Sequence, residues 1–331
     1  MVNGARHFNP GVGMLEDPSR YRVAKRADLR YGCPPPMSSP SAYQGTYTAL
    51  VTPFRDGLVD ETAFTRLLEE QVAAGIDGVI PVGTTGESAT LSMEEHLRVI
   101  ELAVQVVKGR IKVWAGTGSN STSEALYLTQ QAENLGADGF LVVAPYYNKP
   151  SQAGVFAHYA KIAESTTKPI ITYSVPGRCG IEIAVDTIVA LAAKYPNIVS
   201  IKEAGGSIER FSQLRHALPD SVAILSGDDS LTLPAMSVGA VGVISVASNL
   251  IPKQVGDLVR AFLAGRTAEA SALHRQLYPI FRDLFIEANP VPAKTAMARA
   301  GWMTDEVRLP LVPLQPASLA KLEATLKLVG V

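Results

Sequence analysis

Eight short apolar runs recur along the sequence, and this repeat limits the folds that the chain can adopt. They begin near residues 46, 79, 112, 139, 170, 198, 222 and 242, and helical periodicity marks most of the intervals between them. Intervals of about 20 to 34 residues are long enough for the crossover helices that parallel strands need. The repeat therefore predicts an α/β fold, a closed (β/α)8 TIM barrel with its active site at the carboxyl ends of the strands.

Three of the expected corners between a helix and the next strand share a pair of glycines. Gly75, Gly136 and Gly239 stand where a helix ends in a left-handed residue, and a second glycine then opens the strand. The competing architecture is a doubly wound nucleotide-binding sheet, whose glycine-rich loop is most nearly matched by residues 116–121. Because the third glycine of that loop is missing, the barrel is favoured.

The two ends of the chain differ from the repeat. Helical patterns at 252–265, 267–287, 291–301 and 318–330 predict the last barrel helix and a C-terminal helical appendix. We expect the catalytic barrel over residues 43–265 and the helical segment over 266–331. Residues 1–42 combine Gly, Pro and Arg without periodicity, which predicts a disordered extension, and Met37 offers an alternative translation start.

Composition narrows the functional class. A net charge of -1 gives no electrostatic footprint for nucleic acid or for a membrane surface. Cys33 and Cys179 lack metal-ligand spacing, and no apolar run reaches the roughly 18 residues of a membrane span. We therefore expect a cytoplasmic protein that binds small molecules without a metal or a cofactor.

Lys202 is the strongest candidate for chemistry. It ends a β-branched run, residues 198–204, that reads as a strand buried on both faces. Removing water from an ammonium favours the neutral amine, which can attack a ketone and form a Schiff base. The alternative is a strand-end lysine whose stem is buried while its head reaches water.

Other reactive side chains follow other strands. Thr84 and Thr85 lie in a glycine-flanked turn whose hydroxyl and N–H groups suit a carboxylate. Tyr147 and Tyr173 follow the fourth and fifth strands, where a phenol can relay protons, and Arg178 in a Pro-Gly turn can bind a second carboxylate. Taken singly, the turn is more often a structural loop, each tyrosine more often a packing aromatic and Arg178 more often a surface ion-pair partner. Together they fall on the one face where a barrel does its chemistry.

These segments closely resemble the dihydrodipicolinate synthase family. The resemblance covers about residues 43–331 and is strongest at 83–91, 144–150, 173–180, 201–204, 225–229, 242–246 and 289–294. It implies a Schiff-base-forming lyase that condenses pyruvate with L-aspartate 4-semialdehyde to 4-hydroxy-tetrahydrodipicolinate, a step of the diaminopimelate and lysine pathway. Lys202 would form the imine, and Tyr173, Thr84 and Tyr147 would relay protons, the last from a neighbouring subunit.

The resemblance also implies binding residues and regulation. Thr85 would bind pyruvate with Thr84, Arg178 would bind the semialdehyde carboxylate, and the carbonyls of Gly227 and Ile244 would line the pocket. L-lysine would inhibit at an interface between subunits of a homo-oligomer, a dimer of dimers. The matching effector positions are Ser88, Ala89, His96, Asn120, Glu124 and Tyr146.

The sequence departs from the family pattern at three positions and leaves two alternative functions open. Ser174 and Cys179 stand where Asn and Thr are usual, and Met93 replaces a polar group of the effector site. Cys179 beside an arginine allows a thiol of lowered pKa, although a small buried apolar side chain is favoured. One alternative function is a sugar-acid lyase of the N-acetylneuraminate lyase or keto-deoxy-sugar aldolase type, and Arg178 favours the synthase over it. The other is a non-catalytic lysine sensor.

Overall fold

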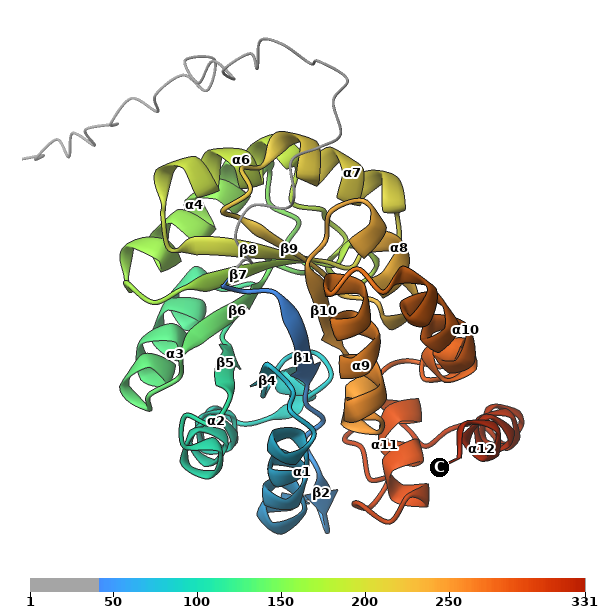
Figure 1. The fold of residues 1–331 in the computed structure, drawn as a ribbon. Coiled ribbons are helices and arrows are strands. Elements are labelled where there is room, and N and C mark those ends of the chain that lie inside the picture. The colour runs from blue at the N-terminus through green and yellow to red at the C-terminus, as the bar shows by residue number, and fades with distance from the viewer. Residues whose placement is uncertain (1–41, 331) are drawn as a thin grey trace, which may run out of the picture. The chain divides into compact units, whose positions relative to one another are not determined.

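A closed barrel of eight parallel strands forms the centre of residues 42–330, the part of the chain that the computed structural model describes (Figure 1). The strands neighbour one another in the order β1-β10-β9-β8-β7-β6-β5-β4, so consecutive barrel strands are adjacent. Their bounds are β1 (Gly45–Ala49), β4 (Gly78–Ile80), β5 (Lys112–Gly116), β6 (Gly139–Val143), β7 (Ile170–Ser174), β8 (Ile198–Glu203), β9 (Ala223–Ser226) and β10 (Gly242–Ser245). The predicted TIM barrel is confirmed.

Helices cover the outside of the strands, as Figure 1 shows. The crossover helices are α1 (Glu61–Ala73), α2 (Met93–Val107), α3 (Thr122–Asn134), α4 (Gln152–Glu164), α6 (Val185–Lys194), α7 (Ile208–Ala217), α8 (Thr232–Ser237) and α9 (Pro252–Leu263). Shorter elements lie in the loops: β2 (Phe54–Arg55), β3 (Leu58–Val59), α5 (Pro176–Cys179), η2 (Ser88–Thr90), η3 (Asp229–Leu231) and η4 (Ala247–Asn249).

Three further helices follow the barrel, as the sequence predicts. They are α10 (Thr267–Asp283), α11 (Val291–Arg299) and α12 (Pro316–Val329), and α10 packs against both α9 and α12. The expected extension over residues 1–42 lies outside the described residues except for Ala42. The division at residue 265 stays a prediction.

The paired glycines have a packing reason. Gly75, Gly136 and Gly239 adopt φ angles of 69°, 95° and 110°, which side chains with a Cβ rarely adopt. At the strand starts, a Cβ on Gly139 would collide with the ring of Trp114, and one on Gly242 would collide with the backbone of Gly45. The glycines therefore let helix ends turn sharply and let neighbouring strands approach closely.

Alternate strand residues point into the barrel and fill it in layers. Trp114 and Tyr47 meet edge to face with ring centres 6.3 Å apart and occupy the end where the strands begin. The paired residues Tyr173 and Lys202 share the inward parity at the opposite end. Aromatic side chains thus fill the end of the barrel where the strands begin, and polar inward side chains lie at the carboxyl ends of the strands.

The C-terminal segment returns to the first elements of the chain, and Figure 1 shows α11 near α1 and β2. The Thr304 hydroxyl donates to the Phe54 carbonyl at 2.5 Å, and the Arg66 guanidinium stacks 5.0 Å above the Trp302 ring. Phe54 itself is fully buried. This contact brings residues near 290–308 beside the loops that follow β1 and β4.

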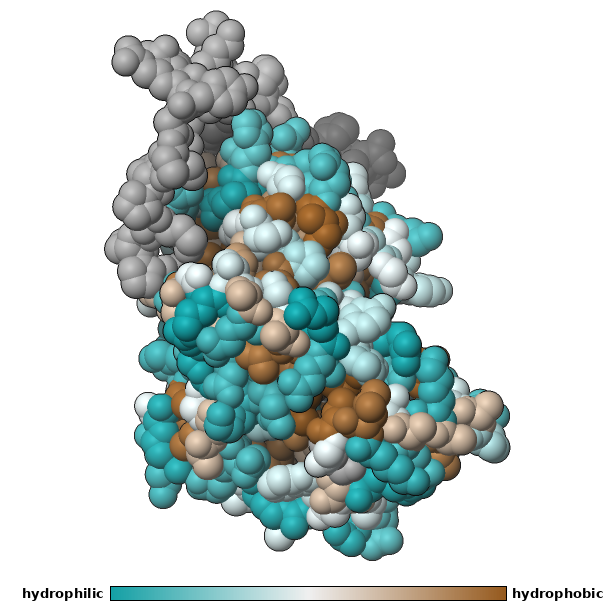
Figure 2. All heavy atoms as spheres, turned by 45° about the vertical axis from the view of Figure 1, so that its right-hand side comes forward, coloured by the Kyte–Doolittle hydropathy of each residue, from teal (hydrophilic) through white to brown (hydrophobic). Residues whose placement is uncertain are grey.

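The surface that carries α9, α10 and α12 is mostly hydrophilic with apolar areas between, as Figure 2 shows. Exposed large apolar side chains on the C-terminal segment are Tyr278, Phe285, Leu309, Val312 and Leu328. Scattered apolar side chains are normal on protein surfaces, so they do not by themselves indicate a partner. Among the described helices, none combines the length and the apolarity that crossing a bilayer would take.

Candidate active site

Lys202 and Tyr173 lie side by side at the carboxyl ends of β8 and β7. They are paired residues of adjacent strands, and the Lys202 Nζ lies 4.2 Å from the centre of the Tyr173 ring. Lys202 is only 5% exposed, so the alternative of a lysine head in bulk water is wrong. Glu203, the next residue, turns outward to the helix layer and pairs with Arg210 at 3.4 Å.

The pKa of the Lys202 amine is lowered to about 7, chiefly by burial; the negative charge of Asp229 opposes this shift and the positive charge of Arg178 adds to it. An ammonium surrounded by protein loses the hydration that stabilises its charge. Near neutral pH a large share of the side chain is therefore the free amine, which has the lone pair that carbonyl attack requires.

Asp229 is the negatively charged residue that raises the pKa of the Lys202 amine. No role was predicted for it from the sequence. It is 1% exposed and accepts hydrogen bonds from the Ser245 hydroxyl and, at 2.9 Å each, from the N–H groups of Val246 and Ala247. Burial raises the pKa of its carboxyl to about 6. The one sequence signal was an acidic residue directly after the turn that ends β9.

The Thr84–Thr85 turn follows β4 and reaches Tyr173. Thr84 and Tyr173 line one small cavity, and the Thr84 side chain is close enough to affect the Tyr173 phenol. Burial raises the pKa of Tyr173 to about 12, against lowering by Arg178 and by Thr84, so the phenol keeps its proton at neutral pH. The structure thus brings Lys202, Tyr173 and Thr84 together, as the sequence analysis predicts.

Asn289 links the second threonine to the arginine. Its side-chain Nδ2 donates to the Thr85 hydroxyl at 3.0 Å, and its backbone carbonyl accepts from the Arg178 Nη2 at 3.0 Å. Asn289 is 5% exposed, whereas Arg178 is exposed on α5. Thr85 and Arg178, which are predicted to bind carboxylates, are therefore both hydrogen-bonded to Asn289 of the C-terminal segment. Asn289 lies in a motif of the family resemblance, but no role was predicted for it.

Gly227 and Ile244 lie at the ends of the neighbouring strands. A Cβ on Gly227 would come within 2.9 Å of the Lys202 Cε and 2.6 Å of the Ala204 Cβ, so the lysine side chain fills the space that glycine leaves. Ile244 is fully buried on β10 and pairs with Tyr47. The use of their carbonyls for ligand binding stays a prediction.

Tyr147 is apart from this cluster. Its side chain is 87% exposed, and its backbone has a left-handed φ of 70°. Within residues 42–330 its hydroxyl has no hydrogen-bond partner. A single chain does not bring Tyr147 to Lys202.

The residues predicted for the effector site lie beside the cluster. His96 is buried, and its Nε2 lies 2.8 Å from the Gly116 carbonyl, while Glu124 accepts from the Ser119 hydroxyl at 2.9 Å. The other predicted positions are Ser88, Ala89, Asn120 and Tyr146, of which Ala89 is exposed and the rest are partly buried.

One of the predicted effector residues shares a narrow cavity with the predicted proton relay. Ser88, Thr84 and Tyr173 line the same space of about 30 Å³, which is enough for a water molecule. Ser88 is therefore a neighbour of Thr84 and Tyr173 across one small void. Binding of an effector at these positions stays a prediction.

Cys179 is a buried structural residue. Its thiol donates to the Ala144 carbonyl at 3.4 Å, and burial raises its pKa to about 11 despite the opposing effect of Arg178. The alternative of a thiol with a lowered pKa is therefore wrong, and the small buried side chain is confirmed.

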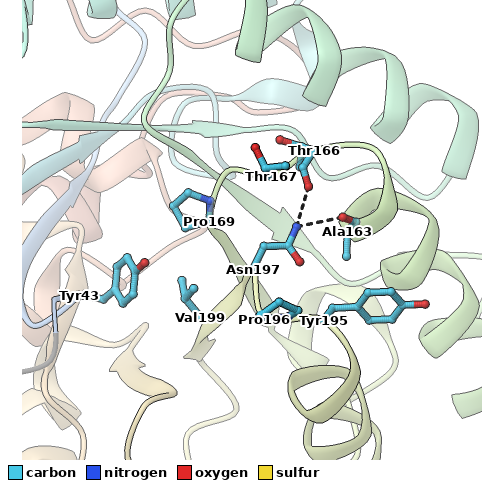
Figure 3. Close-up of a pocket in the computed structure, with 9 residues that line it drawn as sticks. All are labelled: Tyr43, Ala163, Thr166, Thr167, Pro169, Tyr195, Pro196, Asn197 and Val199. Carbon is cyan, nitrogen blue, oxygen red and sulfur yellow. Dashed lines mark hydrogen bonds between the residues drawn. The ribbon is translucent and has the colours of Figure 1, made fainter.

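A larger cavity of about 440 Å³ lies at the other end of the barrel, where β7 and β8 begin (Figure 3). Its lining among the described residues is Tyr43, Ala163, Thr166, Thr167, Pro169, Tyr195, Pro196, Asn197 and Val199. The Asn197 side-chain Nδ2 donates hydrogen bonds to the carbonyls of Ala163 and Thr166, both at 2.9 Å. The described lining carries no acid, base or histidine, so we place the chemistry at Lys202. No group of three or more His, Cys, Asp or Glu side chains in residues 42–330 could hold a metal ion.

Known proteins share this arrangement over most of the chain. The model of the Dihydrodipicolinate synthetase family matches residues 42–329. A 4-hydroxy-tetrahydrodipicolinate synthase from Citrifermentans bemidjiense is 51% identical over 285 residues, 86% of this chain and 98% of the relative. The solved synthase of Methylacidiphilum fumariolicum SolV is 58% identical with a TM-score of 0.86, covering 87% of this chain and 96% of that one. A dihydrodipicolinate synthase from Cyanidioschyzon merolae, solved with lysine bound, is 40% identical with a TM-score of 0.85, covering 87% of this chain and 98% of that one.

The buried amine predicts an unusual pH dependence of chemical modification. Below its pKa of about 7, Lys202 is protonated and unreactive, and above it the free amine predominates. Exposed lysines stay protonated to about pH 10. The protein is modified with a small amine-reactive reagent from pH 5 to pH 10, and the modified peptides are measured by mass spectrometry. The rate of Lys202 modification should rise with pH with a midpoint near pH 7. A midpoint shared with the surface lysines would contradict the desolvated site.

Gly227→Ala should disturb the lysine because the new methyl group would press on the Lys202 Cε. We expect the rate of Lys202 modification at pH 8 to fall by about tenfold, since sub-ångström misplacement of a reacting group is costly. The control Gly227→Ala/Ala204→Gly relieves the contact with the Ala204 Cβ and leaves the contact with Lys202. Full recovery in that double variant would show that crowding of the lysine is not the cause.

Proposed function

The chain belongs to the dihydrodipicolinate synthetase family, and from that membership we propose that Lys202 is the residue with which it binds pyruvate covalently. The enzyme is a lyase that condenses pyruvate with L-aspartate 4-semialdehyde to 4-hydroxy-tetrahydrodipicolinate in lysine biosynthesis. The observation that carries the assignment of Lys202 is its buried amine, 4.2 Å above the Tyr173 ring, with a pKa near 7.

The proposed reaction begins with the neutral amine. The Lys202 Nζ attacks the ketone carbon of pyruvate, and the ketone oxygen leaves as water when the imine forms. Loss of a proton from the methyl carbon gives an enamine, whose carbon attacks the aldehyde of the second substrate. Exchange of the lysine for the amino group of the semialdehyde then closes the ring and frees Lys202.

Proton transfer is assigned to the phenol and the hydroxyl beside the lysine. Tyr173 is protonated at neutral pH and lines one cavity with Thr84, so it can give a proton to the departing oxygen and recover one through the threonine. We assign Tyr147 the next place in this relay, in the active site of a neighbouring subunit. Its 87% exposure within one chain supports that assignment.

The substrate carboxylates are assigned to the two groups that meet at Asn289. The hydroxyls and N–H groups of the Thr84–Thr85 turn bind the pyruvate carboxylate, and Arg178 binds the semialdehyde carboxylate at the open rim. The carbonyls of Gly227 and Ile244 face the pocket between them.

Assembly and regulation follow from the residues outside the Lys202 cluster. If Tyr147 completes a neighbour's site, the active unit is a homo-oligomer, for which we propose a dimer of dimers. The relative solved with lysine bound supports regulation by lysine, and from the family resemblance we assign the lysine site to Ser88, Ala89, His96, Asn120, Glu124 and Tyr146. The cavity shared by Ser88, Thr84 and Tyr173 gives that site a route to the proton relay. We place the enzyme in the cytoplasm.

Borohydride trapping tests the central assignment. Reduction in the presence of pyruvate should add a three-carbon unit to Lys202 and to no other lysine, as seen by peptide mass spectrometry. Lys294, which is also fully buried, is the internal control because its ammonium is paired with Glu87 at 2.6 Å. Lys202→Arg should lose activity by on the order of a thousandfold or more, since guanidinium stays protonated. Trapping at another lysine with Lys202 unmodified would reject the mechanism.

L-lysine should inhibit the enzyme partially. Most of the polar effector positions are present, but Met93, 37% exposed, offers no hydrogen bond where many relatives have a polar group. We expect inhibition weaker than in relatives with the complete set and not simply competitive with either substrate. Titration of L-lysine into the coupled assay, with calorimetry in parallel, measures this. Absence of both inhibition and binding heat at millimolar concentrations would leave these residues as interface only.

A further inference from the structure

Glu87 and Lys294 form a buried ion pair between the Thr84–Thr85 turn and α11. The Lys294 Nζ lies 2.6 Å from the Glu87 Oε1, and the two side chains are 0% and 1% exposed. The same ammonium stacks 4.1 Å above the ring of Phe54, and the Arg308 N–H donates to the Glu87 Oε2 at 3.1 Å. Both oxygens of the carboxylate are thus held by the C-terminal segment.

The turn that Glu87 ends is strained at both sides. Val82 and Glu87 have φ angles of 52° and 54°, a left-handed conformation that is unfavourable for residues with a Cβ. Such residues persist where the surrounding structure holds them in place, and they concentrate at functional sites. The Glu87 N–H also donates to the Thr84 carbonyl at 3.1 Å, so the residue that carries the ion pair fixes the backbone of Thr84.

We infer that Glu87 and Lys294 are positioning residues, whose ion pair sets the Thr84–Thr85 turn in the geometry that binds the pyruvate carboxylate. The inference rests on the proposed function, in which that turn is the pyruvate site. A buried ion pair adds little net stability compared with an apolar pair of the same volume, so stability alone does not account for it. The Asn289 amide, which holds the Thr85 hydroxyl at 3.0 Å, comes from the same segment and acts in the same direction.

The test replaces both charges and leaves the volume nearly unchanged. In Glu87→Gln/Lys294→Met, no buried charge remains unpaired, and the protein should fold. The pyruvate concentration that half-saturates borohydride trapping of Lys202 should rise by about tenfold, while kcat at saturating pyruvate falls by less than about threefold. The matched control is Arg299→Met/Glu323→Gln, which removes an ion pair of 2.8 Å between half-exposed side chains of α11 and α12. The control should keep the wild-type half-saturation by pyruvate and the wild-type kcat.

Single variants separate positioning from stability. Lys294→Met leaves the Glu87 carboxylate buried and unpaired, so it should lower Tm more than the double variant does while half-saturation rises at least as much. Glu87→Gln keeps the shape of the side chain but leaves the Lys294 ammonium buried without its charged partner, so it should raise half-saturation by about threefold and also lower Tm relative to the double variant. If the double variant does not fold, the isosteric Glu87→Gln decides the question by the same measurement.

Several results would overturn the inference. Wild-type half-saturation in a folded double variant would do so, as would an equal rise in the Arg299/Glu323 control. Failure of both the double variant and Glu87→Gln to fold would also count against it, because the pair would then serve folding. If wild-type protein itself shows no trapping at Lys202, the proposed function fails instead.

Discussion

Desolvation of one amine is the constraint on which the site depends. The Lys202 amine is largely neutral near neutral pH because its neighbours keep water away from it. Glycine at 227 makes space for the lysine stem, and the ring of Tyr173 covers the amine at 4.2 Å. Asp229 limits the drop in the pKa of this amine, which lies at about 7.

The barrel provides the strand ends, but it does not by itself hold the loops that carry Thr85 and Arg178, which also contact Asn289. The Thr84–Thr85 turn is strained on both sides and bonded to Glu87, Asn289 and the barrel wall. Its restraints come largely from residues that follow the eighth strand. The C-terminal helices are therefore part of the active-site architecture, and their packing against β2 and α1 serves the loops above the barrel.

The sequence predicted the fold because its determinants are local. Strand periodicity, intervening helices and the glycine pairs at Gly75, Gly136 and Gly239 each act within a few residues, and the structure confirms the barrel they indicate. Lys202, Tyr173 and Thr84 were also predictable as neighbours, since all parallel strands end on the same face. Asp229, Asn289 and Lys294 were not assigned roles because their contacts join distant parts of the chain. The environment of Tyr147 cannot be derived from one chain, since its hydroxyl has no partner within residues 42–330.

The contact between Asn289 and Thr85 joins residues 204 positions apart, and this separation has a consequence for synthesis. A ribosome completes all eight barrel strands, with the nucleophilic lysine among them, before it adds the segment that steadies the threonine turn. A nascent or prematurely terminated chain would hold the amine without the late-arriving support for the pyruvate carboxylate. The order of residues along the chain thus delays the support of the threonine turn, the proposed pyruvate carboxylate site, until nearly the whole polypeptide has been made.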